Sequence, residues 1–134
     1  MDNYYLVGIQ QIGIGTEDMV ASWKWYADMF QMNVRILEDD TVAERMLPYT
    51  GNQPQKRRAC VAINMQGGGG MEIWQYSDRK PVPCPFQVQI GDLGIFAAKI
   101  KCLDVNTFYQ EISKKYNNIS AIETQPDGTP TFWI

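Results

Sequence analysis

The feature that most restricts the fold of this chain is a pattern of residues that occurs twice, 86 residues apart. Each copy begins with an apolar, strand-like segment, continues through an aspartate into residues with helical spacing, and ends in a second short apolar segment. Repetition at this length indicates that one supersecondary unit is duplicated, and the first copy predicts that this unit is βαβββ. The equivalent positions are Ile14 and Ile100, Asp18 and Asp104, Trp23 and Tyr109, Phe30 and Tyr116, and Ile36 and Ile122.

The first copy predicts four strands and one helix. Asp18 is expected to cap the helix, with Thr16 as the alternative, and apolar residues such as Met19 and Trp23 are expected to face the core. Four glycines at 67–70 predict a hairpin turn, because glycine accepts the positive φ angles that such turns require. The predicted strands span residues 6–14, 33–37, 58–65 and 71–76, and the polar residues 38–55 are predicted to form a long connection.

The second copy is predicted to be incomplete. Strands are expected at 96–102, 119–122 and 131–134, with a helix after Asp104 and a QPDG loop at 125–128, but no segment corresponds to the strand at 71–76. We therefore expect an α+β fold of paired βαβββ modules, forming a curled mixed sheet whose last strand is missing. It would be one domain, 1–134, with units at about 5–78 and 92–134. An unpaired sheet edge is normally covered, so we expect either a longer protein with a further C-terminal domain or a homodimer.

The composition excludes several classes of function. The chain has no histidine, which removes imidazole as a metal ligand, as a general base and as a member of a catalytic triad. A net charge of −3 without a basic stripe argues against nucleic-acid binding. The sequence has no apolar run of membrane-spanning length and no signal peptide, so we expect a cytoplasmic protein that binds a small molecule and no membrane. Three cysteines without CxxC spacing are typical of reduced thiols.

Three segments of the sequence resemble the vicinal-oxygen-chelate superfamily, which contains glyoxalases, bleomycin-resistance proteins and extradiol dioxygenases. The segment QQIGIGTEDMVASWKWYADMFQMNVRI resembles the first strand, helix and second strand of such a module. GGMEIWQY resembles the fourth strand, and AAKIKCLDVNTFYQEI resembles the strand and helix of the second module. The resemblance implies that two βαβββ modules curl into an open cup. In the family, a divalent metal in this cup chelates neighbouring oxygens of the substrate, held by ligands from the first and fourth strands of each module.

Carried over by position, the resemblance places the first-strand metal ligand at Gln11 and the fourth-strand ligand at Glu72. Oxygen donors of these kinds could hold Zn, Ni, Mn, Mg or Fe. The corresponding residue of the second module is Ala97, whose methyl group cannot coordinate a metal, and the fourth ligand would lie beyond Ile134. The resemblance therefore implies a metal site that is incomplete in this chain.

Strand alternation adds candidate substrate-binding residues. Trp74 and Tyr76 share a strand face with Glu72 and could form an aromatic wall, and Lys99 shares a face with Ala97 and could attract a carboxylate or phosphate. Each also has a structural explanation, because polar residues on strands are often only solvated and aromatic residues often pack in a core or an interface.

These residues are compatible with three different functions. A glyoxalase-like lyase or isomerase would use Glu72 as a metal ligand and as the catalytic base. A metal-free module of the bleomycin-resistance type would hold a small, oxygen-rich ligand between aromatic side chains. A structural half of a two-domain, dioxygenase-like protein would leave the metal centre to another domain. Metal analysis separates the first from the others, and the sequence beyond Ile134 identifies the third.

Overall fold

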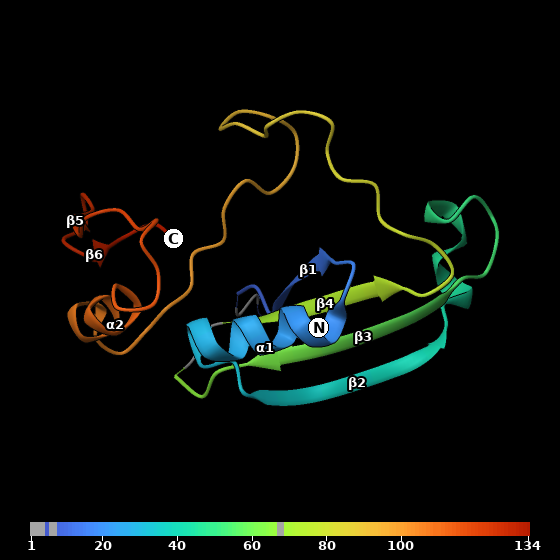
Figure 1. The fold of residues 1–134 in the computed structure, drawn as a ribbon, viewed down its shortest axis with the longest axis horizontal. Helices are drawn as coiled ribbons and strands as arrows, with labels where there is room; N and C mark the ends of the chain where they lie inside the picture. Colours follow the sequence, from blue (N-terminus) through green and yellow to red (C-terminus); the bar gives the residue numbers. More distant parts are fainter. Residues whose placement is uncertain (1–4, 6–7, 67–68) are drawn as a thin grey trace. The chain divides into compact units, whose positions relative to one another are not determined.

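The computed structural model describes residue 5, residues 8–66 and residues 69–134. Contacts divide the chain into two compact units, one that ends at Ile100 and one that spans Lys101–Ile134. The first unit combines helix and sheet, and the second contains a helix and a two-stranded ribbon (Figure 1). The predicted α+β class is therefore confirmed.

The first unit contains a four-stranded sheet in the order β1-β4-β3-β2. Strand β1 runs parallel to β4, whereas β3 is antiparallel to both of its neighbours. The predicted βαβββ unit is thus confirmed, although residues 8–10 are not part of a strand and residues 6 and 7 lie outside the described residues. The element bounds are β1 Gln11–Gly15, α1 Met19–Phe30, β2 Val34–Val42, β3 Lys56–Ile63 and β4 Gly70–Tyr76.

Helix α1 covers one face of this sheet (Figure 1). Asp18 caps it as predicted, because its carboxylate accepts a hydrogen bond from the backbone N of Ala21 at 3.0 Å. Every second residue of β4 faces the helix, so the residues between them face away. The buried core between helix and sheet consists of Met19, Met32, Cys60, Ala62, Met71 and Ile73.

The predicted connection over 38–55 is wrong in its first part. Strand β2 continues to Val42, a 3₁₀ helix, η1, follows at Glu44–Tyr49, and only the remainder is irregular. The charges that suggested a loop are instead matched across the strand pair. Oδ1 of Asp40 lies 3.7 Å from Nζ of Lys56, and Oδ2 of Asp40 lies 3.5 Å from Nε of Arg58; both basic residues are on β3. Such cross-strand ion pairs give a polar edge strand stabilising contacts that its own composition does not reveal.

The glycines before β4 are required for a reason other than the one predicted. Residues 67 and 68 lie outside the described residues, and neither Gly69 nor Gly70 has a positive φ. A Cβ on Gly69 would instead lie 2.8 Å from the carbonyl oxygen of Gln10, and one on Gly70 would lie 2.6 Å from Cγ2 of Ile63. These glycines therefore permit close approach of neighbouring backbone and side-chain atoms.

The second unit contains helix α2, Val105–Ile112, and a ribbon of two short strands, β5 Glu123–Thr124 and β6 Pro130–Thr131. Asp104 caps α2 as the repeat predicts, accepting a hydrogen bond from the backbone N of Thr107 at 2.6 Å. The QPDG segment forms the turn of the ribbon, where the N of Gly128 donates to the carbonyl of Gln125 at 2.9 Å.

The strands predicted at 96–102 and 119–122 are absent, because both segments lack regular secondary structure. In the first segment, Ile100 packs against the core of the first unit, whereas Phe96 is 50% exposed. In the second segment, the backbone N of Ser120 donates a hydrogen bond of 3.0 Å to the carbonyl oxygen of Trp133. The backbone N of Trp133 donates one of 2.9 Å to the hydroxyl of Ser120 and not to its carbonyl, so the two bonds do not form a regular strand ladder. The second module is thus less complete than expected. Its completion by a homodimer or a further domain stays a prediction.

Among the described residues, no helix has the length and apolar character needed to cross a membrane.

The contact at Gly70 yields a stability prediction. Gly70→Ala should lower the free energy of unfolding by about 1–3 kcal/mol, because its Cβ would overlap Ile63 and the backbone oxygen of Ala62, forcing β3 and β4 apart. Gly15→Ala is the matched control, since a Cβ on Gly15 meets nothing within 4 Å, and its effect should stay within about 0.5 kcal/mol. Urea unfolding measures both, and equal midpoints for the two variants would contradict the close approach.

Candidate functional site

The sheet face that points away from α1 carries the residues singled out by the sequence. On β4, Met71 and Ile73 face the core, so Glu72, Trp74 and Tyr76 face the other side. Parallel pairing aligns Gly13 of β1 with Glu72, which places Gln11, two residues earlier, on the same side. Arg57 of β3 pairs with Tyr76 and also shares this side. We call Gln11, Arg57, Glu72, Trp74 and Tyr76 the Glu72 face.

Gln11 and Glu72, 61 positions apart in the chain, meet directly on this face. The Nε2 of Gln11 donates a hydrogen bond of 2.6 Å to Oε2 of Glu72, and both residues are half-buried. A hydrogen bond to an ionised acceptor is stronger than one between neutral groups. Gly13 leaves the space beside them open, because even an added Cβ there would stay 4.0 Å from the carboxylate. The structure therefore brings together the two predicted metal ligands.

One of the aromatic residues of the face, Trp74, contacts a half-buried cation, Arg57. The guanidinium of Arg57 lies 4.6 Å from the centre of the Trp74 ring, and the rings of Trp74 and Tyr76 are 6.4 Å apart. Arg57 also forms an ion pair of 2.7 Å with Asp39 of β2. The Nε of Arg57 is buried and has no hydrogen-bond partner among the described residues. The ring of Trp74 is thus fixed by cation–π contact and not by packing alone.

Arg57 and Asp39 were missed in the sequence analysis. Lys56, Arg57 and Arg58 look like a solvated cluster, but strand alternation separates Arg57 from the other two and directs it to the side of Trp74. The alternation of β3 was the available signal. The partner Asp39 could not be found in the same way, because its segment was predicted to be a loop.

Lys99 and Ala97 are not placed as predicted. Both lie in the exposed segment without regular structure, so the strand alternation that put them on one face does not apply. Lys99 as a substrate-binding residue has no support from the described residues.

The residues present do not fit a resident metal ion. Gln11 presents its amide nitrogen to Glu72, so the amide would have to turn before its oxygen could coordinate. A catalytic zinc site usually has three protein ligands, and the described residues contain no cluster of three histidine, cysteine or acidic side chains. The cysteines do not change this, since burial raises the pKa of the Cys60 and Cys102 thiols and favours their uncharged forms.

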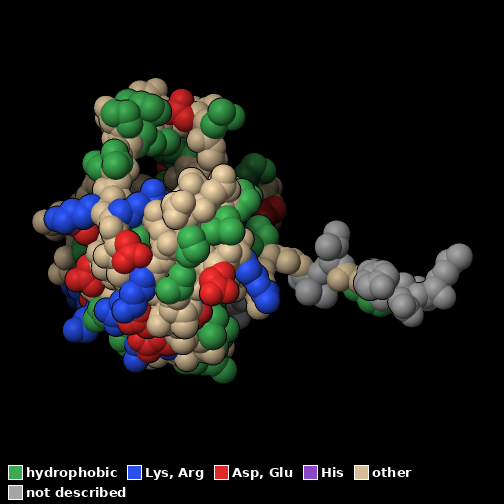
Figure 2. All heavy atoms as spheres, turned by 90° about the vertical axis from the view of Figure 1, so that its right-hand side faces the viewer, with side chains coloured by type: hydrophobic (Ala, Val, Ile, Leu, Met, Phe, Trp, Pro, Cys, Tyr) green, Lys and Arg blue, Asp and Glu red, His purple; other side chains and the backbone are tan. Residues whose placement is uncertain are grey.

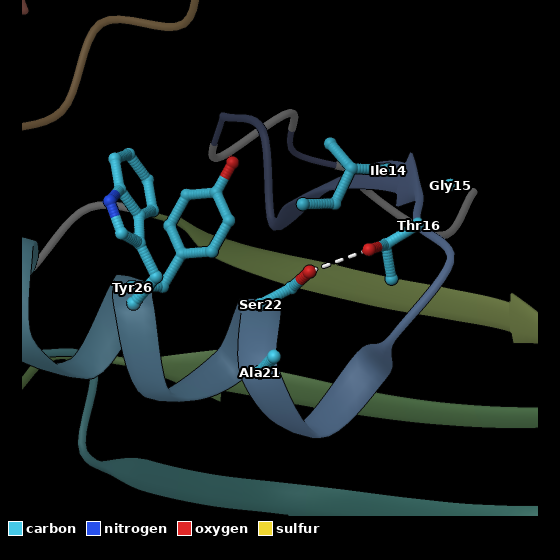
Figure 3. A pocket seen from close by; sticks show the side chains of 7 residues that line it. Ile14, Gly15, Thr16, Ala21, Ser22 and Tyr26 are labelled. Atoms are coloured by element: carbon cyan, nitrogen blue, oxygen red, sulfur yellow. Dashed lines mark hydrogen bonds between the residues drawn. The ribbon is translucent and has the colours of Figure 1, made fainter. Parts of the chain in front are cut away.

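A separate pocket of about 520 Å³ lies on the other side of the sheet, between β1 and α1 (Figure 3). It is lined by Ile14, Thr16, Ala21, Ser22, Trp25 and Tyr26. The hydroxyls of Thr16 and Ser22 are 2.6 Å apart and satisfy each other. Burial raises the pKa of Tyr26, which keeps its hydroxyl protonated. Among the described residues, those that line this pocket carry no charged side chain.

The comparisons with known proteins agree with this fold. The chain is similar to a crystal structure of a glyoxalase family protein from Bacillus cereus, with a TM-score of 0.57 and 13% sequence identity. The similarity covers 93% of this chain and 80% of that one. No family model matches the sequence, and no curated protein matches it either. The chain therefore has a glyoxalase-like fold, as its sequence predicts, and at this identity the likeness shows the fold alone.

The ion pair beside Trp74 predicts a pH dependence. Hydrogen bonds from Thr41 and Arg57 hold the pKa of Asp39 below its ordinary value. Such a carboxyl stabilises the fold at pH values above the pKa that it has in the unfolded chain. This stabilisation is lost as the pH falls through the lower pKa that it has in the folded chain. Asp39→Asn should therefore lower the urea midpoint at neutral pH, and the difference from wild type should shrink below about pH 4. Glu44→Gln, at an exposed position outside the sheet, should leave the midpoint unchanged. A difference independent of pH would refute the electrostatic origin.

The misfit of a metal is also testable. The chain is first dialysed against a chelator, then mixed with one equivalent of Zn²⁺, Ni²⁺, Mn²⁺ or Mg²⁺ and desalted. It should retain far less than one metal per chain. The reason is that Gln11 and Glu72 alone supply too few donors. Elemental analysis gives the answer, and one metal per chain that is lost in Glu72→Gln would show that the site is more complete than described.

Proposed function

We propose that the Glu72 face binds a small, oxygen-rich organic molecule without a resident metal. The proposal rests on the pair of Gln11 and Glu72, a carboxylate and an amide 2.6 Å apart in a half-buried position. The carboxylate can accept a hydrogen bond from a ligand hydroxyl, and the amide oxygen and second N–H of Gln11 can bind a neighbouring group. A ligand with two adjacent oxygens matches this pair.

The surroundings favour a flat, uncharged ligand. Glu72 has no ion pair among the described residues, so its charge attracts hydrogen-bond donors and repels anions. Trp74 and Tyr76 supply adjoining aromatic surface on which a planar group can stack. The positive charge of Arg57 is matched by Asp39 and adds little attraction for an anion.

Proton transfer is a second candidate, favoured by the same adjacency. Glu72 could remove a proton next to a ligand carbonyl, and the Gln11 amide could donate a hydrogen bond to the oxygen on which negative charge develops. This would be the isomerase or lyase activity that the resemblance implies, carried out by a carboxylate and an amide.

Catechol is a suitable probe, since it is flat and has two neighbouring hydroxyls. In NMR titrations it should shift the indole N–H signal of Trp74, assigned with Trp74→Phe, more strongly than anisole, which has no hydroxyl. Glu72→Gln should weaken catechol binding about tenfold, because a neutral amide replaces the charged acceptor at nearly constant volume.

Glu44→Gln is the matched control, as it removes one exposed carboxylate elsewhere and should bind catechol like the wild type. Equal binding by Glu72→Gln and wild type, or equal responses to catechol and anisole, would rule out recognition by Glu72. Turnover is assayed separately, by exchange of α-protons of hydroxyacetone in D₂O. Exchange that Glu72→Gln abolishes would support the second candidate.

A further inference from the structure

A second pocket lies where β4 ends. It is lined by Glu17, Gln75, Tyr76 and residues 77–81, and its volume is about 370 Å³, within the range of sites for small molecules. Figure 2 views the structure from the side toward which β4 runs, and acidic and basic side chains are interspersed over that surface. Of the predicted site residues, Tyr76 lines this pocket, whereas Gln11 and Glu72 do not.

Hydrogen bonds to neighbouring elements fix the walls of this pocket. The side-chain oxygen of Gln75 accepts from the backbone N of Met19, the first residue of α1, at 3.1 Å. Oδ2 of Asp78 accepts from the backbone N of Lys56 at 2.6 Å, and the N of Ser77 donates to the carbonyl of Lys56 at 2.9 Å. The pocket is therefore shaped before any ligand arrives, which reduces the cost of binding.

Two of the four charged side chains of the lining form an ion pair with each other. Lys80 forms an ion pair of 3.2 Å with Glu17, and the carboxylate of Asp78 is held by the backbone of Lys56. Arg79 has no carboxylate within ion-pair distance among the described residues, and its guanidinium lies 4.8 Å from the centre of the Tyr76 ring. The aromatic ring occupies a face of the guanidinium and leaves its N–H edges available.

We propose that this pocket is a binding site for a small molecule with an oxyanion group, a carboxylate or a phosphate, and that Arg79 is its anchor. A planar guanidinium bonds an oxyanion through two parallel N–H groups, and contact with Tyr76 restricts its orientation. The volume accommodates a small organic acid. The proposal concerns a different pocket from the site around Glu72, and it does not depend on the function proposed above.

The test uses benzoate and inorganic phosphate as probes, with the full chain, followed by NMR of the backbone amides of 77–80 and the Arg79 side chain. Binding should be weakened about tenfold or more in Arg79→Gln, since the bonds to the charged group are lost. Lys80→Gln removes the same charge from the neighbouring residue, whose partner is Glu17, and should change the affinity less than about twofold. Arg79→Lys should restore part of the affinity because the charge remains without the paired donors.

The two probes distinguish the oxyanions. Binding of benzoate alone assigns the pocket to carboxylates, and binding of phosphate alone assigns it to phosphates; either result, if lost in Arg79→Gln, supports the proposal. Absence of binding by both probes would overturn it, and so would equal losses in Arg79→Gln and Lys80→Gln, which would indicate unspecific attraction. Glu72→Gln should leave the binding of both probes unchanged, so failure here is distinct from failure on the Glu72 face.

Discussion

The parallel pairing of β1 with β4 positions both the core and the candidate site of the first unit. It aligns Ile12 with Met71 and Gly13 with Glu72, so one register determines which side chains enter the core and which meet on the opposite face. Because β4 is also paired with β3, a slip of one residue in this pairing would exchange the faces of β1, turning Gln11 toward the helix and Ile12 away from it. The cost of burying that amide without a partner favours the observed register.

Backbone proximity reinforces this register. Gly70 donates its N–H to the carbonyl of Gln10 at 2.8 Å, where a Cβ on Gly69 would collide with the same oxygen. The start of β4 therefore lies against Gln10, the residue immediately before β1. The contact that begins the strand pair also brings together Gln11, one residue after Gln10, and Glu72, two residues after Gly70.

Local signals in the sequence predicted those parts of the fold that depend on neighbouring residues. The caps Asp18 and Asp104, the starts of both helices and the alternation of β4 are of this kind. The remaining parts of the fold depend on contacts between residues that are distant in the sequence. The charged residues of β2 form a strand because they pair with β3, which also matches their charges, whereas residues 96–102 have no ladder partner among the described residues and are irregular. For the same reason Gln11 and Glu72 were predicted together, because both lie on strands that form, and Lys99 was not.

The arrangement of charge along β4 limits what one ligand could satisfy. Glu72 is an unmatched carboxylate among the described residues, and Arg79 is an unmatched cation beyond the other end of the Trp74 and Tyr76 rings. Four residues of strand separate Glu72 from Tyr76, a rise of about 13 Å, which exceeds the length of a single aromatic ring. A molecule as small as catechol can therefore occupy only one end. A ligand that engaged both would need a hydrogen-bond donor at one end, an oxyanion at the other and a flat apolar segment between them, and the opposite charges of the two ends would determine its orientation.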